Sequence, residues 1–201
     1  AWVERDPERA VAEMDALLAE IDLESVPAQD RRYPALAMVY AVAGDQERLD
    51  DVASRFREGV EFTADPFGWA RIEAAEALIA VAPADDAALE RLEAAVLEIH
   101  CDRCGDAIVG IGAEAAGRPE RAIEAYERYL TYRYYDGAQH LTHYLGTNVH
   151  ERLGALYEEV GDPVRAAQHY RSFADLWSSA DPGLRARAER ARASAEALGG
   201  G

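Results

Sequence analysis

Residues 150–170 read HERLGALYEEVGDPVRAAQHY and predict one complete helix–turn–helix unit. Large apolar residues recur three and four positions apart before Gly161 and again after it, as they do on one face of a helix. Glycine ends helices in a left-handed conformation, Asp162 is a good cap for the next helix, and Pro163 suits the first turn of that helix. We therefore expect two helices that fold back on each other.

The turn of this unit recurs along the chain. Copies stand at Asp6–Ala10, Gly44–Leu49, Pro83–Ala88, Gly117–Ala122 and Gly161–Ala166. They end at residues 10, 49, 88, 122 and 166, so the period is 34 to 44 residues. Such a period is typical of stacked helical hairpins. We predict an all-α chain in which residues 1–201 form one domain of about four to five stacked helix–turn–helix repeats, with no convincing strand pattern.

The repeats differ in clarity along the chain. They are clearest over residues 103–178 and degenerate over 1–100. Residues 181–198 are predicted to form a helix with few large apolar side chains and many charges, as expected of the polar cap of a stacked array. The first copy begins at its turn and the chain does not begin with Met, which we interpret as a fragment of a longer protein.

Two copies share small and aromatic residues at matching positions. These residues are Leu153, Gly154, Tyr157, Gly161, Ala166 and Tyr170 in one copy, and Val109, Gly110, Gly117, Ala122 and Tyr126 in the other. In this pattern they resemble a tetratricopeptide repeat (TPR). The resemblance implies a right-handed superhelix of hairpins, a TPR-like α-solenoid, in which glycine and alanine let helices approach and leucine and tyrosine fill the space between them.

The C-terminal half carries a narrower set of motifs. They are Cys101-x-x-Cys104, Gly117-Arg118-Pro119, Tyr126-Glu127-Arg128-Tyr129-Leu130, His150-Glu151-Arg152-Leu153-Gly154 and Leu176-Trp177. In this order they are similar to the C-terminal repeat region of bacterial serine/threonine protein kinases and related multidomain signalling proteins. The resemblance implies a regulatory or scaffold segment in the cytoplasm, or outside it if the parent protein has a membrane anchor. The glycine-rich loop and the catalytic segments of a kinase do not occur in the sequence.

The expected function is non-catalytic binding of a peptide or partner domain in the concave groove of the stack. The first helix of each hairpin lines that groove, and the repeat register predicts its polar residues to be Arg31, Glu114, Asn148, Glu151 and Glu158. A groove of this kind suits an extended peptide with basic or amide groups. No esterase, zinc-protease or dinucleotide-binding motif occurs in the sequence, so we expect neither enzymatic activity nor a cofactor.

The net charge narrows the choice of partner. It is −17, and all 21 basic residues are arginine. A chain of this charge repels phosphate backbones, so nucleic acid is not expected as a partner, and a steered partner is expected to be basic. No apolar run is long enough to span a bilayer. Self-association through the incomplete first repeat is a further expectation.

A sensor of redox state, metal or a small molecule is the alternative function. Cys101 and Cys104 are three residues apart, a spacing that fits a metal site, a redox-active or structural disulfide, or two small buried residues at a helix start. Residues 131–147 are rich in aromatic residues and histidine where the repeat period is longest. The predicted wall of a ligand site there consists of Tyr132, Tyr135, His140, His143 and Tyr144. Alternatively, this segment extends two helices and packs on itself.

Overall fold

The computed structural model describes residues 6–132 and 148–199, except for the side chains of residues 24, 102 and 103. Its α-helices are α1 (Pro7–Ala19), α2 (Tyr33–Ala43), α3 (Gln46–Gly59), α4 (Pro66–Ile79), α5 (Asp86–Leu97), α6 (Asp102–Ala115), α7 (Pro119–Thr131), α9 (Val149–Glu159), α10 (Pro163–Leu176) and α11 (Pro182–Gly199). Two short 3₁₀ turns, η1 (Leu23–Ser25) and η2 (Ala28–Asp30), lie between α1 and α2. No strand occurs in these two ranges, so the predicted all-α class is confirmed.

The turns between paired helices have the predicted chemistry. Gly44, Gly117 and Gly161 follow α2, α6 and α9 with φ of +76°, +65° and +78°, a region that glycine enters without strain. The carboxylates of Asp45 and Asp162 accept hydrogen bonds from backbone amides in the first turns of α3 and α10, at 3.1 and 3.0 Å. Each of these short segments therefore ends one helix and starts the next.

The turn between α4 and α5 shows why the copy at Pro83–Ala88 differs in sequence from the others. Ala84 takes the left-handed conformation there, with φ of +64°, although it carries a β-carbon. Its amide donates to the carbonyl of Ala116, at the end of α6, with a distance of 3.0 Å. Asp85 caps α5 in the same way as the other aspartates cap their helices. In the other turns a glycine adopts the left-handed conformation. Here an alanine adopts it, and the hydrogen bond to Ala116 in the neighbouring α6–α7 hairpin accompanies it.

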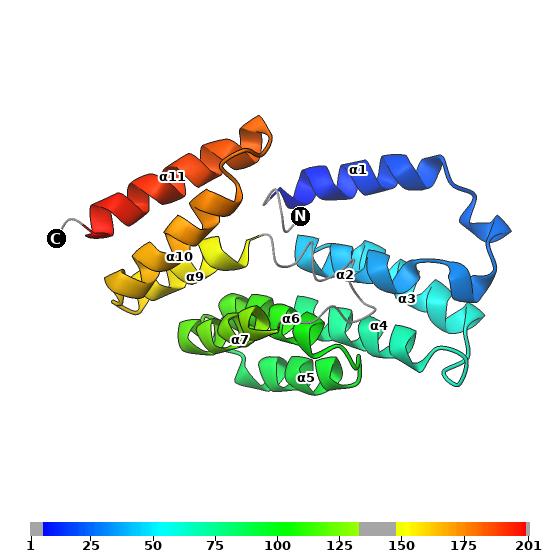
Figure 1. Cartoon of the computed structure of the whole chain (residues 1–201). Coiled ribbons are helices and arrows are strands. Elements are labelled where there is room, and N and C mark those ends of the chain that lie inside the picture. The colour runs from blue at the N-terminus through cyan, green and yellow to red at the C-terminus, as the bar shows by residue number, and fades with distance from the viewer. Residues whose placement is uncertain (1–5, 133–147, 200–201) are drawn as a thin grey trace.

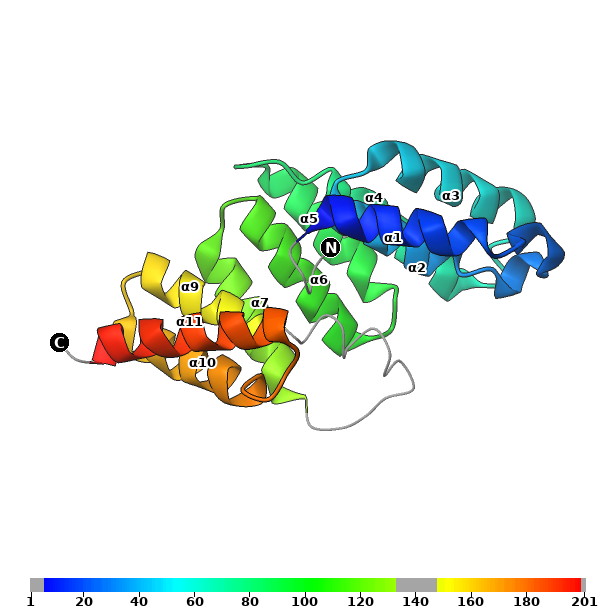
Figure 2. The ribbon, with the colours of Figure 1, turned by 90° about the horizontal axis from the view of Figure 1, so that it is seen from above.

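Consecutive helices pack against each other in order along the chain (Figure 1). The hairpins are α2 with α3, α4 with α5, α6 with α7, and α9 with α10. Contacts of α2 with α4, of α5 with α6 and of α7 with α9 join one hairpin to the next, and α11 packs on α10. Helices α1 and α11 lie on the same side of the molecule, as the view from above also shows (Figure 2).

The α6–α7 hairpin closes around one buried tyrosine. Tyr126 has no exposed surface, and a β-carbon added to Gly110 would lie 2.3 Å from its ring. The Tyr126 hydroxyl donates to Glu114 at 2.6 Å. Burial raises the pKa of Tyr126 well above its usual value, which keeps this hydroxyl a donor. The close approach of α6 and α7 therefore requires glycine at position 110.

The same contact recurs in the α9–α10 hairpin. A β-carbon on Gly154 would lie 2.5 Å from the ring of Tyr170, whose hydroxyl donates to Glu158 at 2.6 Å. Glycine, glutamate and tyrosine keep the same spacing in both hairpins, and the two sets are 44 residues apart in the sequence. These two hairpins therefore repeat one packing arrangement.

The hydrophobic core lies between the packed helices, and α1 contributes no buried residue to it. Alanines and single large side chains such as Phe56, Ile72 and Leu92 are buried between the helices. No residue of α1 is buried, and Leu17 and Ile21 near its end are exposed. Across residues 6–132 and 148–199, no helix has the length and apolar character needed to cross a membrane.

Candidate functional site

A cavity of about 480 Å³ opens between α5, α6 and α7, and we call it the α5–α7 cavity. It is lined by Glu93, Val96, Leu97, Gly105, Asp106, Val109, Arg121, Glu124, Arg128 and Tyr132. Charged and apolar side chains thus meet in one open space, a combination that suits binding of an amphipathic ligand.

The charged groups of the α5–α7 cavity are held by ion pairs. Arg121 on α7 donates to Glu93 on α5 at 2.6 Å. Arg128 donates from Nε to Asp106 at 2.9 Å and from Nη1 to Glu124 at 3.0 Å. These bonds connect α7 to α5 and to α6 and hold three carboxylates and two guanidinium groups around the cavity.

Two smaller cavities lie at other junctions of the helices. One of about 340 Å³ lies between α1, α2 and α3 and includes Asp15, Asp51, Leu18 and Tyr40. Another, of about 190 Å³, lies between α9, α10 and α11. In each of the three cavities, the lining comes from three helices that follow one another in the chain.

The residues predicted for the concave groove are engaged in contacts within the chain. Arg187 on α11 donates to Asn148 at 2.8 Å and forms an ion pair with Glu151. Glu114 accepts from Tyr126 and also from Arg152 on α9, at 3.0 Å from Nε. These bonds connect α9 to α11 and α6 to α9.

The other two predicted groove residues lie apart from this network. Glu158 is exposed and accepts the hydroxyl hydrogen bond of Tyr170. Arg31 follows η2 and donates from Nε to the backbone carbonyl of Val26 at 2.8 Å. The structure therefore does not bring all five residues together, and their role in binding stays a prediction.

Of the predicted aromatic wall, Tyr132 lies in the described part of the chain. It follows α7, is partly exposed and lines the α5–α7 cavity. Tyr135, His140, His143 and Tyr144 lie outside the described residues.

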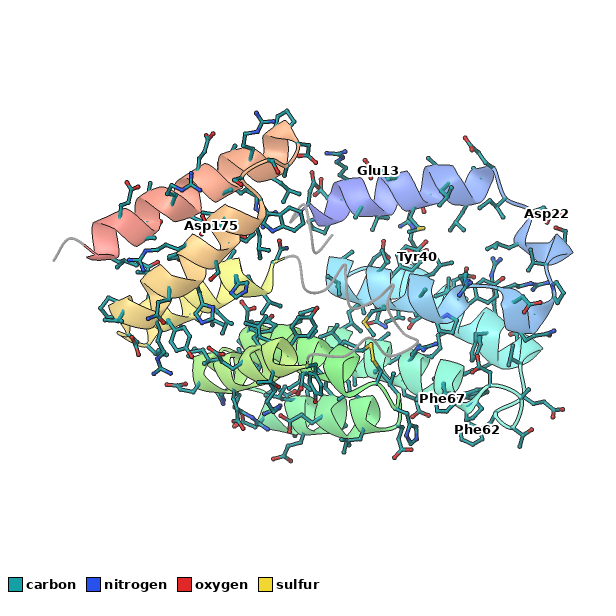
Figure 3. The ribbon with its side chains drawn as sticks, viewed as in Figure 1. Glu13, Asp22, Tyr40, Phe62, Phe67 and Asp175 are labelled. Atoms are coloured by element: carbon teal, nitrogen blue, oxygen red, sulfur yellow. A yellow bond between two sulfur atoms is a disulfide. The ribbon has the colours of Figure 1, made fainter. Side chains whose placement is uncertain are left out.

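Cys101 and Cys104 form a disulfide at the start of α6 (Figure 3). Their exposed fractions are 5% and 2%, and the Cys101 sulfur accepts a hydrogen bond from the Cys104 amide at the helix start. Both sulfurs are used in the covalent bond, so in this form they are not metal ligands. Within the described ranges, no group of three or more His, Cys, Asp or Glu side chains is placed to hold a metal ion. Among the alternatives for this pair, the disulfide is the one observed.

Reduction of this disulfide is expected to lower the free energy of unfolding by about 2 kcal/mol, since a bond across four residues restricts the unfolded chain by about that amount. Chemical denaturation with and without reductant measures the change. The Cys101→Ala/Cys104→Ala double variant is the control, because reductant should not affect it. Equal unfolding midpoints of the native chain in both conditions would contradict a stabilising disulfide.

A pair of histidines, neither of them among the predicted site residues, forms a second polar cluster. His150 on α9 and His169 on α10 face each other with 3.0 Å between their Nδ1 atoms. The Nε2 atom of His169 lies 3.1 Å from a carboxylate oxygen of Glu127 on α7. The ring of Tyr157 stacks on His169 at 5.4 Å, and its hydroxyl donates to Glu127 at 2.9 Å.

This geometry sets the protonation of the histidine pair. A carboxylate beside Nε2 of His169 favours the tautomer with its proton on Nε2, so Nδ1 accepts and His150 donates. Burial, reinforced by the neighbouring His169, lowers the pKa of His150 to about 4. Burial also lowers the pKa of His169, against the opposing effect of Glu127. Both rings are therefore neutral near pH 7.

A signal for this cluster was present in the sequence. Gly154 and Tyr170 meet across the hairpin, His150 precedes Gly154 by one helical turn, and His169 is adjacent to Tyr170. The repeat register therefore places both histidines on facing helices. Glu127 could not be found in this way, because its approach depends on how α7 packs against the following hairpin.

In comparisons with known proteins, no protein-family model, no curated protein and no solved structure matches the chain.

Proposed function

We propose that this chain is a non-catalytic interaction module that binds a peptide or partner domain of net positive charge. The proposed architecture is a right-handed superhelix of TPR-like hairpins capped by α11. The recurrence of the glycine, glutamate and tyrosine contact in two hairpins supports this architecture, since equivalent packing generates equivalent hairpin geometry. On the resemblance of its motifs, we propose that it serves as a cytoplasmic regulatory segment of a bacterial signalling protein.

The observation that carries the binding proposal is the series of open cavities between consecutive helices. One cavity lies between α1, α2 and α3, one between α5, α6 and α7, and one between α9, α10 and α11, and each is lined by both charged and apolar side chains. We propose that a partner laid along the helices places side chains in one or more of these cavities. This is how repeat proteins use their long surfaces.

Charge supports a basic partner. The net charge is −17, and the first hundred residues account for −14 of it. Carboxylates line all three cavities, for example Asp51, Glu93 and Glu151. A basic segment would be attracted over a distance comparable to the Debye length, and this attraction weakens as salt is added.

The test begins with capture of partners from the source lysate and continues with calorimetry on the purified partner. We expect binding to weaken with increasing salt and in an Asp51→Asn/Glu93→Gln/Glu124→Gln variant. A Glu90→Gln/Glu189→Gln/Glu196→Gln variant changes the net charge equally, at positions that do not line the cavities. Equal binding by both variants, or substrate turnover by the chain, would contradict the proposal.

A redox sensor is the second candidate function, favoured by the observed disulfide. Cys104 directly precedes Gly105 and Asp106, which line the α5–α7 cavity. Reduction would break the bond between Cys101 and Cys104 at the start of α6, and we propose that this loosens the segment that carries these residues. If the chain is a sensor, the purified partner should bind differently to the oxidised and reduced forms, and the Cys101→Ala/Cys104→Ala variant should not respond. Equal binding by both forms of the native chain would exclude this function for that partner.

A further inference from the structure

The chain exposes two of its four phenylalanines, and both lie at the connection between α3 and α4. Phe62 is 59% exposed and Phe67 is 47% exposed, whereas Phe56 and Phe173 are buried. Figure 3 shows the two exposed rings at the edge of the molecule near the start of α4. Together with the partly exposed Trp69, they form a patch that we call the α3–α4 aromatic surface. Aromatic side chains that gather on a surface are typical anchors of protein–protein contacts.

Contacts with the core hold this surface in shape. The ring of Phe62 packs edge-on against that of Trp69, and Trp69 packs in the same way against the buried Phe56, with 6.1 Å between the ring centroids of each pair. The Trp69 indole donates from Nε1 to the backbone carbonyl of Val60 at 3.1 Å, which ties the connection to α4. A partner would therefore find these rings already positioned and would not have to order them on binding.

The α3–α4 aromatic surface continues toward the end of α5. Phe67, the second residue of α4, packs edge-on against His100, which follows α5, with 5.4 Å between the ring centroids. None of Phe62, Phe67 and Trp69 lines any of the three cavities described above. The surface is therefore separate from the cavities on which the proposed function rests.

The charge around the aromatic surface indicates what can bind there. Residues 58–70 contain three acidic residues and no basic one. The acidic residues are Glu58, Glu61 and Asp65. Of the arginines on either side, Arg57 donates to both carboxylate oxygens of Glu76, and Arg71 is partly buried on α4. Glu61 directly precedes Phe62 and is exposed, so its charge attracts a cationic group within the Debye length.

The exposed part of the aromatic surface is apolar. Arg57 already lies over the Trp69 ring, with its Cζ atom 5.5 Å from the ring centroid. The chain thus supplies its own cation to this ring, and the exposed area belongs mainly to the phenyl rings of Phe62 and Phe67. An apolar side chain covers phenyl rings best, because the gain grows with the apolar area that is removed from water.

We propose that the α3–α4 aromatic surface docks a basic segment of a partner protein, in which an aliphatic side chain covers Phe62 and Phe67 and a neighbouring arginine or lysine lies near Glu61. The inference rests on the proposed function for the positive charge of the partner, and it adds an apolar anchor outside the cavities. Charge brings such a segment to an acidic chain, whereas the apolar contact distinguishes this segment from other basic ones.

The test uses the full chain with its phenylalanine rings labelled for NMR. The probes are the acetylated and amidated peptides Arg-Arg-Leu-Arg-Arg and Arg-Arg-Ala-Arg-Arg, which have equal charge and differ in the apolar side chain. We expect the leucine peptide to shift the ring signals of Phe62 and Phe67 and to bind about fivefold more tightly than the alanine peptide. A Phe62→Ser/Phe67→Ser variant should lose this preference, whereas Leu176→Ser, which removes an apolar side chain that is 64% exposed on α10, should keep it. Glu61→Gln should weaken binding of both peptides more than Glu189→Gln, an equal change of charge at an exposed position of α11.

Three results would overturn the inference: equal affinity for both peptides, an unchanged preference in the Phe62→Ser/Phe67→Ser variant, or equal effects of Glu61→Gln and Glu189→Gln. Dimerisation of the native chain that the phenylalanine variant abolishes, measured by sedimentation, would assign the surface to a second copy and would also overturn it. Unfolding of each variant is followed by circular dichroism, so loss of the fold is distinguished from loss of the site. If the phenylalanine variant does not fold, the comparison of the two peptides on the native chain decides the question.

The outcome for this surface is separable from that for the proposed function. Capture of a basic partner that binds the phenylalanine variant as tightly as the native chain would overturn this inference and leave the proposed function standing. A leucine preference at this surface without any captured partner would support the inference and count against the proposed function.

Discussion

Replacing Tyr126 with alanine is expected to lower the free energy of unfolding by about 4 kcal/mol. The ring is fully buried against Gly110, and its removal costs the transfer free energy of the ring together with that of the cavity left behind. The hydroxyl also donates to Glu114, which accepts from Arg152 on the next hairpin. Urea denaturation followed by circular dichroism measures the change.

Two further variants separate the parts of this effect. Tyr126→Phe keeps the ring and loses the hydrogen bond to Glu114, so we expect a loss of about 1 kcal/mol. Tyr132→Ala removes a partly exposed ring just after the same helix and should cost less than about 1 kcal/mol. A Tyr126→Ala chain as stable as Tyr132→Ala would mean that the α6–α7 hairpin does not close around this side chain.

Lowering the pH from 6.5 to 4 is expected to destabilise the folded chain by about 3 kcal/mol through His150 alone. The pKa of His150 is about 4 in the folded chain, where burial and the facing His169 disfavour the charged ring, whereas it is near 6.5 in the unfolded chain. Between these values the unfolded state binds more protons, so stability falls as the pH falls. More than about one pH unit above 6.5, both states are neutral at this residue, and its effect is constant.

The pH effect is measured as a difference between proteins, because the many carboxylates of the chain also titrate below pH 5. Denaturation at several pH values from 7 to 4 compares the native chain with His150→Asn and with His100→Asn. His100 is exposed, and asparagine tolerates its left-handed backbone. The native chain should lose more stability than His150→Asn over this range, while His100→Asn should follow the native chain. Parallel curves for the native chain and His150→Asn would contradict the neutral histidine pair.

The histidine cluster and the Tyr126 contact show which contacts the repeat register can predict and which it cannot. Because Gly154 lies close to Tyr170 and Gly110 close to Tyr126, the register was sufficient to place facing residues within each hairpin. It did not predict contacts between hairpins, such as that of Arg152 with Glu114. Those depend on the angle and offset between successive hairpins, which side chains far apart in the sequence set jointly.

The predicted groove residues show the same difference between what the repeat register places within a hairpin and what depends on packing between helices far apart in the chain. The register predicts Asn148 and Glu151 on the first helix of their hairpin, and the structure has them at the start of α9. Arg187 lies 36 or more residues later in the chain than these two residues. It bonds to them because α11 packs against this hairpin. An isolated hairpin would leave these groups open to a peptide, whereas the packed chain supplies its own arginine.

By itself, the sequence determined the helical class, the turns and the two residues that can form the disulfide. Helix periodicity, the left-handed glycines and the aspartate caps act within a few residues, so they can be read from the sequence alone. Tertiary structure alone decided which charged groups meet, that an oxygen of Asp106 lies buried without a donor, and that His150 faces His169 beside Glu127. The reason is physical: the energy of a charge depends on its burial and on partners a few ångströms away, and neither exists until the helices have packed.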